Sequence, residues 1–146
     1  MTKFPMAFTV HAHSESGIQK AWTTSAASEL GDVKVAIPPE FEGPGHGFSP
    51  EDLFAMALQN CFVATFKVFA EKSRLQFSDI RVTTVLEVDR DDKGKPWMAR
   101  AHLKVLLGGV NQVENARRIL ERTSQSCMIL NSVKTEKTFE FEITNI

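Results

Sequence analysis

The sequence predicts an α+β fold with the element order βββ-α-ββ-α-β and a mostly antiparallel sheet. Three observations predict it. Apolar and polar residues alternate with the two-residue period of strands near both ends of the chain and in its middle. A long apolar helix with a strong start signal follows a glycine-rich loop, and a second, amphipathic helix precedes the last strand. Strands and helices do not alternate one for one, which favours α+β over a parallel doubly wound sheet. The length of 146 residues fits one domain, residues 1–146.

The N-terminal part is predicted to form three short strands. Residues 8–13 and 33–37 alternate in polarity, and residues 18–25 form a second extended run after a glycine turn. Residues 41–47 carry three glycines and a proline and are predicted to form a loop.

A long helix is predicted to begin at Ser49-Pro50. Ser49 can cap the helix, Pro50 suits its first position, and Asp52 stands where a capping-box acid would. The helix should run to about residue 73 and is apolar nearly all round. A surface helix would show one apolar stripe. We therefore expect this helix to be buried on most sides, at the centre of the domain or of a dimer.

The C-terminal half is predicted to hold a hairpin, a helix and a strand. Residues 80–88 and 97–107 alternate as two strands, and Gly108-Gly109 should end the second. Residues 111–114 resemble a capping box that opens a helix ending near Cys127. The last strand is expected at 138–143.

Composition excludes several classes of protein. The net charge of −1 and the lack of a basic run argue against a nucleic-acid or anionic-membrane partner. No apolar stretch reaches the ~20 residues that a membrane helix needs. The N-terminus lacks the apolar core of a signal peptide, so a cytoplasmic protein is expected.

Two cysteines, Cys61 and Cys127, are the candidates for chemistry. Cys61 lies midway along the apolar helix, and Cys127 ends the second helix on its inward face. In a reducing cytosol such a pair is either two small core side chains or a reversible disulfide. The second role needs a thiolate, a group that lowers its pKa, and a second thiol in reach. Spacing alone leaves both interpretations open.

Two segments resemble the OsmC/Ohr family. The first resembles the family signature of a glycine-rich loop, a Ser/Asn-Pro-Glu helix start, an alanine-rich turn and a cysteine; it covers residues 45–62, GHGFSPEDLFAMALQNCF. The second covers residues 126–131, SCMILN, and differs at Met128, where proline usually follows the cysteine. The expected element order also matches the family over nearly the whole chain.

The resemblance implies an intertwined homodimer with the long helices buried at its centre. It implies a thiol-dependent peroxidase that reduces organic hydroperoxides, with Cys61 peroxidatic and Cys127 resolving. A dithiol reductant, such as a lipoyl-type one, then recycles the disulfide. No metal or organic cofactor is implied. His11 and His13 alternate on one strand without an evident third ligand, so a zinc site is not expected.

The resemblance also makes Glu51 the acid that orients the site's cation. Glu51 precedes Cys61 by ten residues, or about 15 Å along a helix, so it would act through a long cationic side chain or on the partner's thiol. The alternative is an acid favoured by the helix dipole. The family's N-terminal arginine has no counterpart before Arg74. Lys20 is the nearest substitute, or else an ordinary solvated strand residue.

Two residues are candidates for substrate binding. His46 in the glycine-rich loop could hydrogen-bond substrate or tune Cys61, or it is an exposed loop histidine. Phenylalanines on the long helix, Phe62 among them, could form an apolar pocket that favours organic hydroperoxides.

Other functions remain open at this stage. The missing arginine and proline favour a non-catalytic protein that binds a small apolar or acyl ligand. A purely structural dimer module is the third possibility. The reactivity of Cys61 distinguishes the enzyme from the other two.

Overall fold

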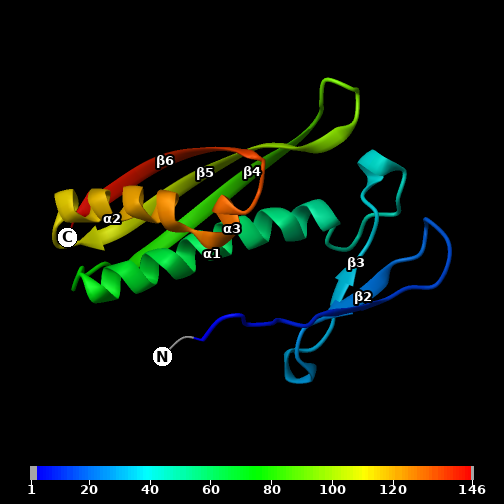
Figure 1. The fold of residues 1–146 in the computed structure, drawn as a ribbon, viewed down its shortest axis with the longest axis horizontal. Coiled ribbons are helices and arrows are strands. Elements are labelled where there is room, and N and C mark those ends of the chain that lie inside the picture. Colours follow the sequence, from blue (N-terminus) through cyan, green and yellow to red (C-terminus); the bar gives the residue numbers. More distant parts are fainter. Residues whose placement is uncertain (1–2, 146) are drawn as a thin grey trace. The chain divides into compact units, whose positions relative to one another are not determined.

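The computed structural model describes residues 3–145, and its contacts divide the chain into two compact units, Met1–Leu53 and Phe54–Ile146 (Figure 1). The division falls inside one continuous helix, α1 (Pro50–Lys72). The observed order of strands and helices is the predicted one, with a short helix α3 added after α2 and two 3-10 turns, η1 and η2, added in the first unit. The fold is α+β, as predicted.

The first unit contains a small antiparallel sheet in the order β1-β2-β3. Its elements are β1 (His11–His13), β2 (Trp22–Ser25), η1 (Ser28–Leu30), β3 (Val33–Val35) and η2 (Pro39–Phe41). The strands are shorter than predicted, because each pair of adjacent strands is joined through only three residues of each strand. Few side chains of this unit are buried, namely those of Val35, Ala36 and Ser49.

The second unit contains a sheet in the order β4-β5-β6. Its strands are β4 (Asp79–Arg90), β5 (Pro96–Val110) and β6 (Glu136–Asn145). β4 and β5 pair antiparallel, whereas β5 and β6 pair parallel because two helices cross over between them. Gly108-Gly109 does not end β5, contrary to the prediction. The strand continues through an irregularity there, with Gly109 at φ +63°.

α1, α2 (Val113–Ser126) and α3 (Met128–Asn131) lie along this sheet (Figure 1), and their side chains pack with those of the sheet in the core. The buried face of β5 alternates with its exposed face over residues 99–107. The core joins side chains from β5, α1, α2 and α3, among them Leu103, Val105, Phe62, Phe66, Leu120 and Leu130.

Within the single chain α1 buries a single stripe, so the predicted burial on most sides would need a second copy, as at the centre of a dimer. The stripe consists of Leu58, Phe62, Phe66 and Ala70, four residues apart. The opposite side is open, and Val68 there is 49% exposed. By length and composition alone α1 could cross a membrane, but the apolar core helix of a soluble protein passes the same test.

The start of α2 also differs from the prediction. Gln112 occupies the cap position without a side-chain hydrogen bond to the helix. Asn111 instead bonds the segment before β4: its Oδ1 accepts from the backbone N–H of Gln76, and its own N–H donates to the carbonyl of Gln76, both at 3.2 Å. Residues 111–114 therefore do not form a capping box.

Candidate active site at the paired thiols

The second unit brings Cys61 and Cys127 into contact. Cys61 is half-buried on α1, and Cys127 is 0% exposed at the junction of α2 and α3. The two side chains are close enough to influence each other's protonation, and both thiols are free. The structure thus places both cysteines inward and together, although they are far apart in the sequence. Two free thiols that are close in space are the starting arrangement for a disulfide.

The environment of Cys127 keeps its thiol protonated. Burial is the main cause that raises its pKa from 9.0 to about 11, and the hydrogen bond with Cys61 adds to it. Backbone N–H groups of Leu130 and Ile129 act in the opposite direction and are outweighed. At neutral pH Cys127 is therefore a weak nucleophile, and Cys61 is the better candidate for the first attack.

Cys127 is held by the backbone at the break between two helices. Its extended conformation (φ −72°, ψ 119°) ends α2 and begins α3. Its N–H donates to the carbonyl of Thr123 at 3.2 Å, and its carbonyl accepts from Asn131 at 3.0 Å. The backbone of Cys127 is thus hydrogen-bonded to both helices, which fixes the position from which its thiol projects.

Side chains tie α3 to its surroundings from two directions. Asn131 donates from Nδ2 to the carbonyl of Gln125 at 2.9 Å. Lys137 at the start of β6 donates from Nζ to the carbonyls of Leu130 at 2.8 Å and Val133 at 3.0 Å. Sequence reasoning missed Lys137. The available signal was its place on the β6 face that otherwise carries phenylalanine and isoleucine.

Phe62, next to Cys61, belongs to the core. It is 0% exposed, and its ring lies 5.9 Å from that of Phe139 and 6.2 Å from that of Phe141, measured between centroids. These contacts dock α1 on β6 and so help to hold Cys61 in place. The expected role of Phe62 in a substrate pocket stays a prediction.

Glu51 in the first unit has a buried carboxylate oxygen. Its Oε1 has no hydrogen-bond partner among residues 3–145. A buried polar atom of this kind needs a donor from outside these residues or from a rearranged side chain. Lys20 does not supply it here: its side chain is exposed in the turn closed by its own N–H and the carbonyl of Gly17, 3.1 Å apart. Lys20 thus lies before β2 rather than on the predicted strand.

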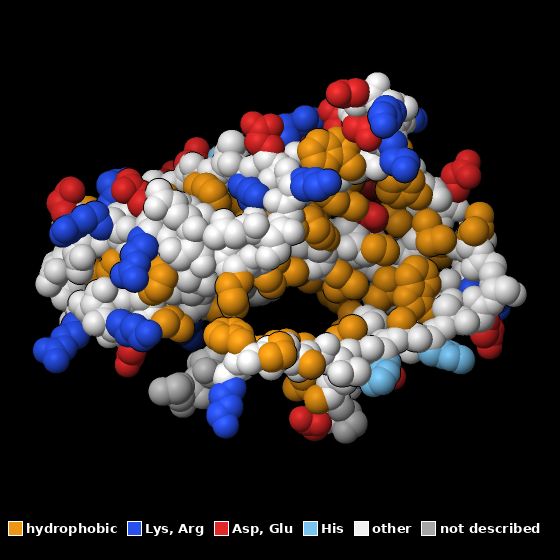
Figure 2. All heavy atoms as spheres, in the orientation of Figure 1, with side chains coloured by type: hydrophobic (Ala, Val, Ile, Leu, Met, Phe, Trp, Pro, Cys, Tyr) orange, Lys and Arg blue, Asp and Glu red, His pale blue; other side chains and the backbone are white. Residues whose placement is uncertain are grey.

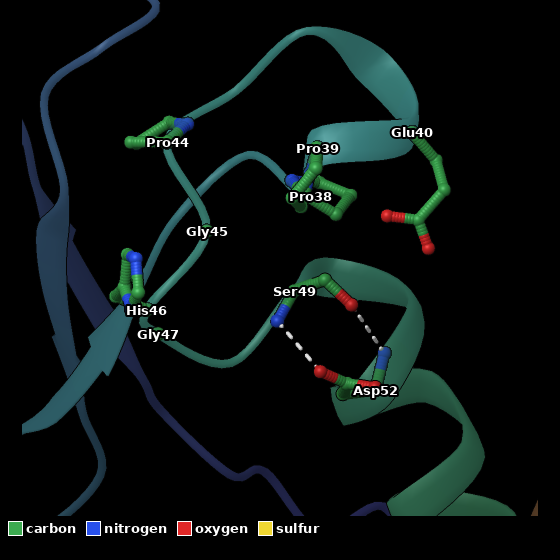
Figure 3. A pocket seen from close by; sticks show the side chains of 9 residues that line it. All are labelled: Pro38, Pro39, Glu40, Pro44, Gly45, His46, Gly47, Ser49 and Asp52. Atoms are coloured by element: carbon green, nitrogen blue, oxygen red, sulfur yellow. Dashed lines mark hydrogen bonds between the residues drawn. The ribbon is translucent and has the colours of Figure 1, made fainter.

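His46 lines a pocket of about 290 Å³ in the first unit (Figure 3). The residue is exposed, has φ +59°, and shares the pocket with Pro38, Pro39, Glu40 and others. The pocket lies beside the start of α1 in the loop that residues 41–47 were predicted to form. The structure places His46 in this pocket, and its predicted role in binding substrate or tuning Cys61 stays a prediction.

The predicted capping box of α1 is confirmed (Figure 3). Ser49 Oγ accepts from the N–H of Asp52 at 2.9 Å, and Asp52 Oδ2 accepts from the N–H of Ser49 at 3.0 Å. In the preceding loop, position 43 has room only for glycine, because a Cβ there would clash with the carbonyl oxygen of Ile37.

The ion pairs found in the described part of the chain lie on the exposed face of the second sheet. Arg100 bonds Glu87 at 3.0 Å and Asp89 at 2.8 Å, and Lys104 lies near Glu140 and Glu142. Being exposed, they contribute little to stability. The residues 3–145 contain no cluster of three metal-ligating side chains.

Comparisons with known proteins agree on the family. The family of OsmC-like proteins matches residues 43–142. A protein of Acinetobacter baylyi described as uncharacterized is 26% identical over 137 residues, covering 93% of this chain and 92% of its own.

Solved structures with the same fold include an OsmC-like protein of Vibrio cholerae, with 19% identity and a TM-score of 0.81 over 94% of this chain and 99% of its own. The organic hydroperoxide resistance protein OsmC of Legionella pneumophila has 20% identity and a TM-score of 0.74, over 97% and 99% of the two chains. The family match spans more than half of the sequence and includes the helix of Cys61 and the junction of Cys127. The chain therefore belongs to the family of OsmC-like proteins.

Proposed function

We propose that this protein is a thiol-dependent peroxidase that reduces organic hydroperoxides. The observation that carries the proposal is the contact between Cys61 and a buried, protonated Cys127. Support comes from the family and from the fold shared with an organic hydroperoxide resistance protein.

The chemistry would proceed in two balanced steps. The Cys61 thiolate attacks the outer oxygen of ROOH, the O–O bond breaks, and the alkoxide takes a proton to leave as ROH. The thiol of Cys127 then attacks the sulfur of the Cys61 sulfenic acid, forming the disulfide and releasing water. A dithiol reductant, such as a lipoyl-type one, returns the pair to two thiols.

A cation near Glu51 is part of the proposal. The unpartnered Oε1 of Glu51 supports a site that is completed by a donor, and Lys20 is the candidate by sequence position. A lysine ammonium supplies a point charge where arginine would supply a planar fork. We therefore expect Glu51 to fix the orientation of a lysine less strictly than it would fix that of an arginine.

A homodimer in the cytoplasm is the proposed form of the protein. Much of the apolar surface is uncovered in the single chain, and Figure 2 shows hydrophobic side chains gathered on the visible face. Phe8 of the first unit is 87% exposed, and α1 leaves one whole side open. Exposed apolar surface on this scale marks an interaction surface. A second copy is the occupant that the family resemblance implies.

The decisive experiment measures how fast the reduced protein consumes cumene hydroperoxide, with free thiols counted before and after. We expect wild type to lose both thiols and Cys61→Ser to lose none. Cys127→Ser should react once and then proceed to the sulfinic acid, because no resolving thiol remains. The proposal is wrong if wild type reacts no faster than a free small-molecule thiol of similar pKa. That result would favour the binding of a small apolar ligand by a protein with inert cysteines.

A further inference from the structure

Lys137 is a cation on the core-facing side of β6. Its side chain is half-buried and shares this face with Phe139, Phe141 and Ile143. A lysine in such a position is expected to reach for polar partners, because its ammonium loses water on burial. The partners are the carbonyls of Leu130 and Val133, at 2.8 and 3.0 Å.

These two carbonyls belong to the segment that follows Cys127. Leu130 lies in α3, and Val133 lies just beyond its end, where helical carbonyls lack main-chain partners. Leu130 is also 1% exposed and contributes its backbone N–H to the environment of the Cys127 thiol. The same residue thus links the Lys137 ammonium to the sulfur environment of Cys127.

A four-residue helix does not hold its shape by itself. The conformational entropy lost in forming a first helical turn exceeds the free energy gained from its hydrogen bonds. α3 therefore depends on contacts with the rest of the chain. Asn131 supplies one contact to α2, and Lys137 supplies two from β6. Without Lys137, the side of α3 that faces β6 would lose its charged anchor.

We infer that Lys137 is a positioning residue that holds α3, and with it Cys127, in place to close the disulfide with Cys61. The inference rests on the proposed function for its chemistry, and it concerns the second step. The first step, attack of Cys61 on the hydroperoxide, does not involve α3. Loss of the anchor lowers the effective concentration of Cys127 at the Cys61 sulfur.

The direct test measures that effective concentration without any peroxide. Reduced protein is equilibrated with mixtures of oxidised and reduced glutathione: the dithiol and one oxidised glutathione give the protein disulfide and two reduced glutathiones. We expect Lys137→Met to lower the equilibrium constant by about tenfold, a modest displacement by the standard of positioning effects. Lys137→Arg keeps the charge and the donors, and it should stay within about threefold of wild type.

Lys134→Met is the matched control. Lys134 is exposed in the same connection between α3 and β6 and makes no hydrogen bond or ion pair among residues 3–145. Lys134→Met removes the same charge three residues from Lys137, and it should leave the equilibrium constant with glutathione unchanged. If Lys137→Met does not fold, as judged by circular dichroism, Lys137→Gln replaces it, since its amide is too short to bond both carbonyls. A folded variant with the wild-type constant would overturn the inference.

A second measurement separates this inference from the proposed function. With cumene hydroperoxide, Lys137→Met should oxidise Cys61 at the wild-type rate and accumulate several times more sulfinic acid, because closure competes less well with a second hydroperoxide. A general loss of stability would slow both steps together. If wild type fails to react while the glutathione constant still falls in Lys137→Met, the peroxidase proposal is wrong and the positioning role holds.

Discussion

Because the Cys127 thiol is buried, the free energy of unfolding changes with pH in the alkaline range. The unfolded thiol loses its proton near pH 9.0, whereas the folded thiol keeps it to about 11. Between these values the unfolded state binds fewer protons, so the free energy of unfolding falls as pH rises. The stabilisation is fully present below pH 9, and it is lost as pH rises through about 11.

We expect the slope to reach up to about 1.4 kcal/mol per pH unit in this window. Urea denaturation of the reduced protein at half-unit steps from pH 8 to 11 measures it. Cys127→Ala is the control, because it removes this titration and leaves those of the lysines in place. Identical slopes in both proteins would show that Cys127 is not buried as a neutral thiol.

At the scale of residues, sequence reasoning found both cysteines and missed Lys137. The inward position of Cys127 followed from helical spacing, and that of Cys61 from the apolar character of its helix, both of which are local properties. The role of Lys137 depends on the position of α3 beside β6, which is a tertiary contact. The alternation of residues along β6 gives only the face of the strand on which Lys137 lies. For the same reason the sequence placed Lys20 on a strand, whereas the structure shows a turn.

At the scale of elements, the capping box is the clearest local determinant of α1. Ser49→Ala removes one of two reciprocal bonds at the helix start, and we expect the free energy of unfolding to fall by about 1 kcal/mol. Ser73→Ala near the other end of α1 is the matched control, since Ser73 is exposed, and it should change stability by less than about 0.5 kcal/mol. Chemical denaturation of both variants measures the difference. Equal effects would mean that the cap contributes nothing beyond the loss of a hydroxyl.

Some elements were predictable and others were not, for a physical reason. α1 was predicted within a residue of its end because its signals are local to its own sequence. The parallel pairing of β5 and β6 was not, because partner and direction depend on a crossover between distant segments. Asn111 looked like a helix cap and instead bonds Gln76, since both partners compete for the same side chain.

At the scale of the whole molecule, the open side of α1 predicts a dimer. Light scattering coupled to size exclusion should give about twice the chain mass of 16.3 kDa. Val68→Lys places a charge on the open side, and we expect it to weaken the dimer at least tenfold in Kd. Lysine is the better helix former, so in a monomer the same change would not destabilise α1.

Thr83→Lys is the control for this prediction. Thr83 is exposed on β4, on the face of the second sheet that carries the ion pairs, and the added charge there should leave the dimer intact. A wild-type protein of monomeric mass contradicts the dimer. A Val68→Lys dimer as stable as wild type would place the interface somewhere other than the open side of α1.

The contact between the two thiols also has a consequence for the denatured chain. A bond between Cys61 and Cys127 would close a loop of sixty-six residues. In the chain-entropy account, a covalent loop of that length lowers the conformational entropy of the denatured ensemble. The loss raises the free energy of that ensemble by about 4 kcal/mol at 25 °C. The oxidised form is then harder to unfold than the reduced form, so molecules awaiting reductant are protected from proteolysis while they wait.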